Sequence, residues 1–259
     1  MPTPAQLLRQ RIRAGLHKGP TAGLAAGYVQ ANVVILPAAA ADDFELFCQY
    51  NAQACPLIRR QPPGDPFLDQ DAFQADIRTD VPRYRVFRHG VPEPSEPTDI
   101  RHLWRPDLVT FLIGCSFTFE HALLEAGLPV RHIEQGRNVP MYRTNVPCRP
   151  AGPFSGPLVV SMRPFRPSEV ELVQQVTARY PRMHGAPVHV GDPQALGISD
   201  LSRPDFGDAV TVYSDEIPLF WACGVTPQLA MENAKLELAI THSPGCMFIT
   251  DRLHDHFRE

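Results

Sequence analysis

The stretch FLIGCSFTFEHALLEAG, residues 111–127, decides how the rest of the chain is interpreted. Its first three residues are apolar, as in a buried β-strand, and Gly114 ends that run. A cysteine and a serine follow side by side, and the remaining residues are typical of a helix. Cys115 and Ser116 therefore lie at a strand-to-helix turn, where a side chain either packs tightly or faces the free N–H groups of the helix start.

A second stretch, IPLFWACGVTPQLAMENAK at residues 217–235, repeats this order. An apolar strand is followed by small residues with a cysteine, then by a cap and a helix. Thr226 is expected to be the cap, with Pro227 at the first helical position. The shared order indicates either a weak internal duplication or a coincidence between two strand-to-helix turns, and the sequence leaves both interpretations open.

Strand-like and helix-like segments alternate along the whole chain, which predicts a mixed α/β (α+β) fold. The 28 prolines predict much ordered loop around it. Strands are expected at ANVVILP (31–37), RYRVFRHG (83–90), LVVSMRP (158–164), APVHVGDP (186–193), the segment 208–224 and GCMFIT (245–250). Helices are expected at 3–14 behind a Thr3 cap, at 42–53, at 117–126, and at 169–180 behind a Ser168 cap.

The 259 residues are enough for one domain with a substantial core, so we expect a single domain over 1–259. A proline-rich and acidic segment within 61–100 is the place where a break between two subdomains would fall. Residues 19–41 carry no charge, but their glycines, Gln30, Asn32 and Pro37 favour a turn and a buried strand over a membrane span.

The overall charge excludes one large class of partner. With 24 Lys and Arg against 28 Asp and Glu, the net charge is -4, and no basic tract suits nucleic acid. The six cysteines form no CxxC pair, so free thiols in the reducing cytoplasm are expected. The sequence is also compatible with a homo-oligomer.

Several arginines stand alone in loops rich in proline and glycine, among them Arg143 and Arg163. A guanidinium grips a carboxylate with two parallel hydrogen bonds, which favours small acids as ligands. Solvated surface charge is the simpler interpretation for most of these arginines.

Two cysteines precede expected helix starts. Cys115 and Cys223 would lie near unsatisfied N–H groups, which favour a thiolate or a bound anion. Buried cysteines, however, often only pack at such junctions. The hydroxyl of Ser116 is a natural helix cap, although Glu120 falls one residue late for a capping box, and the stretch is not the GxSxG elbow of hydrolases.

Proton transfer near neutral pH needs histidine or a paired acid, and His184, His242 and Glu216 combine such groups with turns. His189 alternates with valines on a strand and is expected to be a buried histidine bonded to backbone. These groups lack the spacing of a zinc motif, and no GxGxxG or Walker sequence is present, so neither a metal nor a nucleotide cofactor is expected.

Long blocks of the chain are similar to one known family, the bacterial hydro-lyase family that is grouped with D-glutamate cyclase. The blocks are FCQYNAQACPLI (47–58), FLIGCSFTFE (111–120), NVPMYRTNVPCRPAGPFSGPLVVSMRP (138–164), HGAPVHVGDPQALGISDL (184–201), FWACGVTPQLA (220–230) and ITHSPGCMFITD (240–251). The resemblance implies a cofactor-free lyase for a small carboxylate or amino acid, most specifically one that closes D-glutamate to 5-oxo-D-proline with loss of water.

Site roles can be assigned on that basis. Arg143 and Arg163 would hold carboxylates, while His184, His242 and Glu216 would move protons. Cys115 and Ser116, as further candidate catalytic residues, and Cys223 and Thr226, as substrate-binding residues, would form an anion-holding wall with the helix starts behind them.

Two other functions fit the same residues. A non-catalytic module that binds or carries a carboxylate metabolite would use the same arginines without a proton-transfer pair. A metal-dependent hydrolase would need histidines 184, 189 or 242 to cluster with Asp215 or Glu216.

Overall fold

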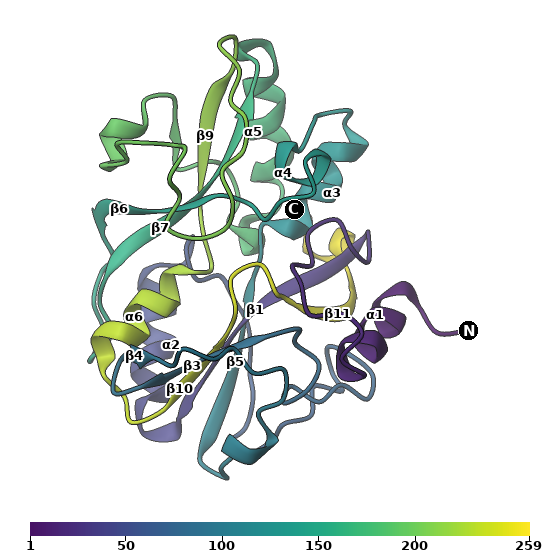
Figure 1. Cartoon of the computed structure of the whole chain (residues 1–259), viewed down its shortest axis with the longest axis vertical. Helices are drawn as coiled ribbons and strands as arrows, with labels where there is room; N and C mark the ends of the chain where they lie inside the picture. Colours follow the sequence, from purple (N-terminus) through teal and green to yellow (C-terminus); the bar gives the residue numbers. More distant parts are fainter.

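Two antiparallel sheets form the framework of the computed structural model, which describes residues 1–259 (Figure 1). The first sheet has the order β2-β5-β1-β10-β3-β4, with β11 beside β1. Its strands are β1 (Tyr28–Pro37), β2 (Leu57–Arg60), β3 (Tyr84–Arg88), β4 (Val91–Pro92), β5 (Leu108–Gly114), β10 (Ala239–His242) and β11 (Phe248–Leu253). The second sheet has the order β6-β7-β9-β8. Its strands are β6 (Met141–Pro147), β7 (Pro157–Phe165), β8 (His189–Val190) and β9 (Ile217–Ala222).

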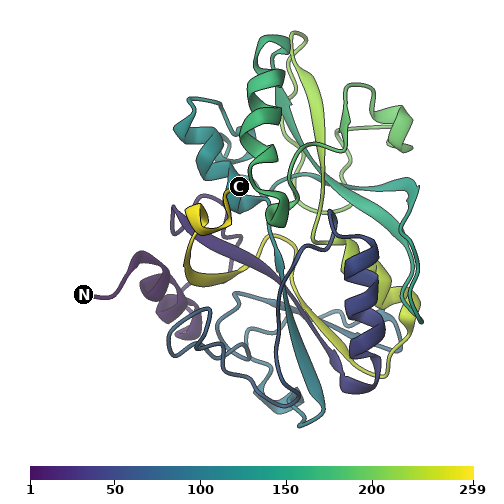
Figure 2. The same cartoon turned by 180° about the vertical axis from the view of Figure 1, so that it is seen from behind.

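The helices complete a mixed α/β (α+β) fold, as the sequence predicts. They are α1 (Pro4–Arg13), α2 (Ala41–Tyr50), α3 (Phe117–Glu125), α4 (Arg131–Glu134), α5 (Val170–Ala178) and α6 (Thr226–Ala234). Helices α2 and α6 lie against the first sheet, whereas α3 and α5 lie with the second (Figures 1 and 2). None of the helices is long and apolar enough to cross a membrane.

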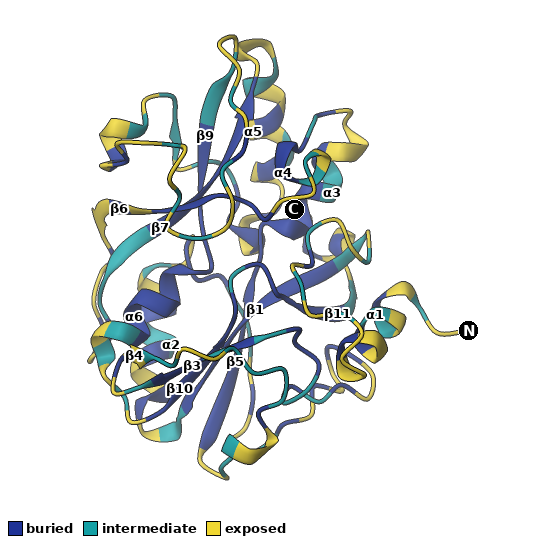
Figure 3. Ribbon diagram, viewed as in Figure 1, coloured by how far each residue is buried: buried dark blue, intermediate teal, exposed yellow.

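Loops cover the opposite faces of both sheets. The expected break region around 61–100 contributes β3 and β4, and its irregular segments bury Leu68, Ile77 and Ile100 against the first sheet. Leu196 and Val210 cover the second sheet in the same way. Buried strands therefore lie between helices on one face and loops on the other (Figure 3).

The helix caps predicted at Ser168 and Thr226 are wrong. Other residues occupy the cap position of the first helix, and a strand binds the hydroxyl expected to cap the second. Thr3 does cap α1 through a capping box with Gln6. Ser168 caps nothing, because a short turn precedes α5 and Glu169 accepts the N–H of Arg166 at 2.9 Å. Helix α6 begins after Val225, and the hydroxyl of Thr226 instead accepts the N–H of Val159 at 3.0 Å.

The strand predicted at 208–224 is too long, because only Ile217–Ala222 is extended and paired. Carbonyl groups in the preceding segment accept hydrogen bonds from arginine side chains, that of Ala209 from Arg137 and that of Thr211 from Arg131. The strand predicted at 186–193 shortens to His189–Val190 for lack of partners beyond β9.

Each strand-to-helix turn passes from one sheet to the other. Strand β5 belongs to the first sheet, but Phe119 and Leu123 of α3 pack with Phe165 and Trp221 of the second. Conversely, β9 belongs to the second sheet, while α6 packs Ala230 and Met231 into the core of the first. Each sheet thus packs against a helix that follows a strand of the other sheet, which we call the exchange of helices between the sheets.

The two turns also share their hydrogen bonding. The sulfur of Cys115 accepts the N–H of Phe117 at 3.5 Å, and the carbonyl of Cys115 accepts the N–H of Thr118 at 3.1 Å. The corresponding carbonyl of Cys223 accepts the N–H of Thr226 at 3.0 Å.

The threonines of the two turns bind equivalent strands. The hydroxyl of Thr118 accepts from the N–H of Gln30 on β1 at 3.4 Å, as that of Thr226 does from Val159 on β7. The register agrees, since the next residue of each strand pairs with the residue before each cysteine: Ala31 with Gly114, and Val160 with Ala222. This matched geometry accords with the weak internal duplication indicated by the sequence.

Asn32 ties the two turns together. It is buried on β1 and donates its amide N–H to the carbonyl of Gly114 at 2.6 Å. A Cβ added to Gly224 would lie only 2.0 Å from the same amide nitrogen. Gly224 is therefore required by a close approach between the second turn and the side chain that holds the first.

Replacing Gly224 by alanine is expected to destabilise the protein by about 1–3 kcal/mol, because the new methyl group overpacks against Asn32. Asn32→Ala alone should cost a similar amount, since it removes the buried hydrogen bond to the Gly114 carbonyl. The double variant should lose less than the sum, because Asn32→Ala makes room for the methyl group. Urea denaturation measures all three free energies of unfolding.

Gly19→Ala is the matched control, because its nearest neighbour atom would lie 4.0 Å away. That variant should be neutral or slightly stabilised. Strict additivity of Asn32→Ala and Gly224→Ala would contradict the contact.

Candidate active site

Cys115 and Cys223 meet in one apolar cluster at the crossing of the two turns, together with Val159 and Met247. Burial raises the pKa of both thiols, that of Cys223 to about 11. Both sulfurs are therefore neutral thiols near pH 7. They give this part of the site an apolar and polarizable wall.

A buried ion pair lies beside this cluster. The Nε of Arg163 on β7 donates to Glu120 Oε1 of α3 at 2.9 Å, and its Nη2 contacts the same oxygen. Its remaining contacts are with two hydroxyl groups, Nη1 with Ser161 and Nη2 with Ser116, each at 3.0 Å. The Ser116 hydroxyl therefore does not cap α3, as the sequence suggested it could, but binds the guanidinium.

Two aromatic rings lie beside the guanidinium of Arg163. Its guanidinium carbon lies 5.3 Å from the ring centres of both Phe119 and Trp221. Aromatic faces attract a desolvated cation. The side chain thus has hydrogen-bond acceptors and aromatic rings around it, and it is fully buried.

Glu120 has one oxygen held and one free. Oε1 also lies 3.2 Å from Nε2 of His132 on α4, whereas Oε2 is buried without any hydrogen-bond partner. Burial alone would raise the pKa of Glu120, but His132 and Arg163 favour the charged form and hold this pKa below its usual value. The result is a buried, ionised carboxylate with one acceptor oxygen left unused.

A narrow hollow reaches Glu120 from the surface. Its walls include Gly23, Gly27, Phe117 and Thr118 together with Glu120 itself. A loop before β1 forms one side and the first turn of α3 the other.

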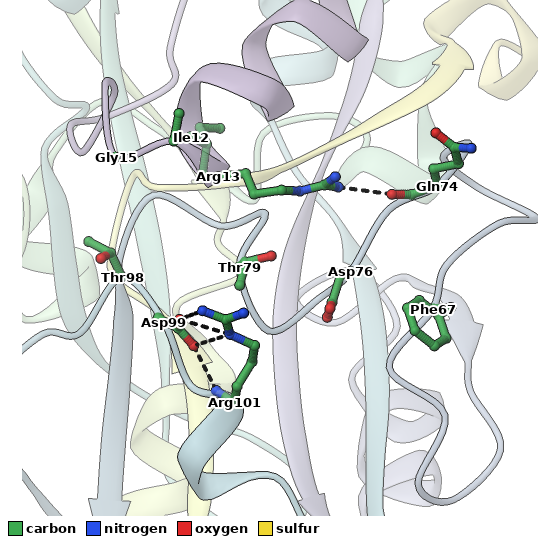
Figure 4. Close-up of a pocket in the computed structure, with 11 residues that line it drawn as sticks. Ile12, Arg13, Gly15, Phe67, Gln74, Asp76, Thr79, Thr98, Asp99 and Arg101 are labelled. Atoms are coloured by element: carbon green, nitrogen blue, oxygen red, sulfur yellow. Dashed lines mark hydrogen bonds and ion pairs between the residues drawn. The ribbon is translucent and has the colours of Figure 1, made fainter.

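A larger hollow lies elsewhere, between α1 and the loops of the 61–100 region (Figure 4). Its charged side chains are already paired: Arg13 with Asp80, and Arg101 with Asp99. None of the predicted site residues lines either hollow. We place the candidate site at Glu120 because one oxygen of this buried carboxylate has no hydrogen-bond partner.

His184 and His242 each contact a backbone group through Nδ1. His184 has a left-handed backbone with φ of 76° and its Nδ1 lies 2.8 Å from the carbonyl of Gln53. His242 Nδ1 accepts the N–H of Val33 at 3.1 Å, and its Nε2 is buried without a partner. Burial lowers the pKa of each to about 4, so both are neutral near pH 7.

The structure gathers some predicted site residues and separates others. It brings together Arg163, Ser116, Cys115 and Cys223. Thr226 adjoins Cys223 in the second turn. Glu216 instead binds Arg131, with a shortest N–O distance of 2.5 Å.

Arg143 lines a different hollow, together with Tyr142 and Arg203. It is half-exposed on β6, opposite Val159 of β7, and its carboxylate partners Asp205 and Glu232 are both at 3.8 Å. Its guanidinium lies over the ring of Phe206 at 5.5 Å. His189 is partly exposed, and its Nε2 lies 2.7 Å from the carbonyl of Asp192.

Four residues of the site were not predicted as such: Glu120, His132, Ser161 and Asn32. Two of them had a recognisable pattern, because Asn32 and Ser161 are polar residues inside largely apolar strands. Ser161 also precedes Arg163 by two positions, which places both on the same face of a strand. Nothing local marks His132.

His242→Asn is expected to make the protein less sensitive to acid. An unfolded histidine binds a proton below about pH 6.5, whereas the folded His242 does so only below about 4, so the unfolded state binds more protons between these values. Stability is therefore lost as pH falls through this window, by up to about 3 kcal/mol for this residue. Asparagine can accept the Val33 N–H without titrating.

Urea midpoints at pH 7 and pH 5 measure this effect. The variant should lose less stability than the wild type between the two values, while His189→Asn, at a partly exposed position, serves as the control. Equal losses in His242→Asn and the wild type would contradict the assignment.

Comparison with known proteins identifies the family of the chain. A family model described as D-glutamate cyclase matches residues 109–251. A protein of Rubrobacter xylanophilus described as "Putative hydro-lyase" is 64% identical, with 94% of each chain covered. One of Bordetella pertussis with the same description is 61% identical, covering 95% of this chain and 88% of its own. A solved nitrogen repressor-like protein from Methanococcus jannaschii gives a TM-score of only 0.39 at 9% identity, over 98% of this chain and 99% of its own. The chain belongs to the D-glutamate cyclase family of hydro-lyase-like proteins.

Proposed function

We propose that the protein is a hydro-lyase for a small carboxylate and, specifically, that it closes D-glutamate to 5-oxo-D-proline. Membership of the family supports the reaction class. One structural observation carries the proposal: Glu120, one of the residues that line a hollow, has the Oε1 of its buried carboxylate fixed by Arg163 and its Oε2 unpartnered.

The proposed reaction needs proton transfers but no redox step. The substrate ammonium loses one proton to Glu120, and the amine attacks the carbon of its own side-chain carboxylate, forming the C–N bond. Glu120 returns this proton to an oxygen of that group, then takes a second proton from nitrogen and delivers it to the departing hydroxyl. Two protons from nitrogen and one carboxylate oxygen leave as water, so atoms and charge balance.

Arg163 positions Glu120 in this proposal. Its four side-chain hydrogen bonds go to Glu120, Ser116 and Ser161, which leaves little capacity for a substrate carboxylate. A charge pair with this geometry keeps the carboxylate ionised and its free oxygen directed. Ser116 contributes through the same guanidinium.

Arg143 is assigned to the substrate α-carboxylate. It lies on the same face of the second sheet as Val159 and Arg163, because directly paired residues share a face. Val159 and Arg163 are four strand positions apart, roughly 13 Å. A long arginine side chain and a five-carbon substrate together can span much of that distance. Loose ion pairs at 3.8 Å leave the guanidinium able to accept a better partner.

The remaining predicted residues form the walls in this proposal. The thiols of Cys115 and Cys223 line the apolar side, and Thr226 fixes the second turn through Val159. His184 and His242 support the turns through backbone contacts.

Glu120→Gln is expected to lower turnover of D-glutamate by about 100-fold or more, because it removes the proton carrier. Arg143→Ala should mainly raise KM, since it weakens ground-state binding. Chiral chromatography of D-glutamate and 5-oxo-D-proline, in both directions, measures the reaction. Glu171→Gln and Arg166→Ala, at exposed positions, are matched controls and should retain wild-type rates.

Circular dichroism and urea midpoints separate loss of chemistry from loss of folding, because Glu120→Gln weakens a buried ion pair. Ser116→Ala, which retains that pair, should give a smaller loss of turnover. A folded Glu120→Gln variant with full activity would overturn the assigned role. A wild type that binds D-glutamate without converting it would favour the carrier function.

A further inference from the structure

We propose that His121, Glu125 and His254 form a binding site for a divalent transition-metal ion. His121 and Glu125 lie one turn apart on α3, and His254 begins the short turn η6 (His254–Phe257) that follows β11. One potential ligand atom from each residue lies within 4.8 Å of those from the other two. This cluster is separate from the residues of the proposed reaction.

The contacts within the cluster bring its groups toward one point. His121 Nε2 lies 3.3 Å from Glu125 Oε1, and the rings of His121 and His254 have their centres 4.8 Å apart. Residues four apart on a helix face the same side, so α3 presents an imidazole and a carboxylate together. Two of the three candidate ligands therefore come from one helix, and the third, His254, comes from a distant part of the chain.

The imidazole of His254 is buried and has an unpaired nitrogen. Its side chain is only 8% exposed, and its Nδ1 is buried without a hydrogen-bond partner. Its Nε2 lies 3.4 Å from Asp255 Oδ1, a contact of the type that orients a ligating histidine. Burial of an imidazole nitrogen without a partner is costly, and coordination of a cation would satisfy it.

The donor set defines the class of ion. Two imidazoles and one carboxylate suit zinc and similar transition metals, whereas magnesium and calcium prefer oxygen ligands alone. Three protein ligands leave a coordination position open for water or an anion. His121 also lines the hollow that reaches Glu120, so a bound ion would lie at the margin of that hollow.

Calorimetric titration of the metal-stripped full chain with Zn²⁺ tests the proposal. One equivalent of Zn²⁺ should bind. His121→Ala, His254→Ala and Glu125→Gln should each raise the Kd for Zn²⁺, by about 10-fold or more for each histidine variant. Visible spectra of the Co²⁺ complex provide a second readout, because bands of a low-symmetry site should appear in the wild type and disappear in the histidine variants.

His189→Ala is the matched control and should bind as the wild type does, since His189 lies outside the cluster. Glu120→Gln should also keep full Zn²⁺ affinity while losing turnover, which distinguishes failure of this site from failure of the proposed function. His254→Ala could disturb the fold through its buried position, so the more exposed Glu125 provides a variant that folding does not confound. Absence of binding, or binding that His121→Ala and Glu125→Gln both leave unchanged, would overturn the proposal.

Discussion

The guanidinium of Arg163 is fully buried, and the groups around it are arranged to satisfy its charge and its N–H groups. Removing such a charge from water costs several kcal/mol, which only a well-placed partner and full hydrogen bonding offset. Glu120 supplies the charge, two serines supply further acceptors, and two aromatic rings close the sides. These groups come from two strands of the second sheet, from α3 and from the turn that precedes it, so the pair joins segments that are far apart in the sequence.

The matched turns carry different chemistry on the same backbone geometry. The register makes Val34 of β1 the counterpart of Arg163 on β7, and Gln228 of α6 the counterpart of Glu120 on α3. Val34 packs into an apolar core, while Gln228 donates to the carbonyl of His242 at 3.0 Å. One half of the framework therefore carries a buried charged pair where the other has an apolar residue and an amide that binds backbone. The two halves differ here in two side-chain positions rather than in fold.

Much of the framework could be predicted from the sequence, because buried strands are continuous apolar runs and the helices have clear periodicity. The strands at 31–37 and 158–164 are examples. The errors arose where tertiary contacts compete with local preference. Thr226 is a good cap by composition, but a strand N–H binds its hydroxyl, and arginines hold the carbonyl groups of 209 and 211.

The site could be predicted only in part for the same reason. The grouping of Arg163, Ser116 and the two cysteines follows from two similar turns and from the blocks around them. His132 and Glu120 are joined only by folding, since no local spacing relates a residue on α4 to the buried face of α3. Glu216 resembled a catalytic acid because nothing in YSDEIP shows that Arg131 is beside it.

The exchange of helices between the sheets also limits how the molecule can move. In many two-lobed enzymes a hinge lets the lobes separate, and the substrate enters between them. Here, separation of the sheets would pull Phe119 and Leu123 away from Trp221, and Met231 away from the core of the first sheet. That would expose two apolar interfaces at once, which opposes separation of the two sheets. The hollow beside Glu120 is bounded by the short segment before β1, where Gly23 and Gly27 both adopt positive φ and where Gln30 and His254 bind the backbone carbonyls.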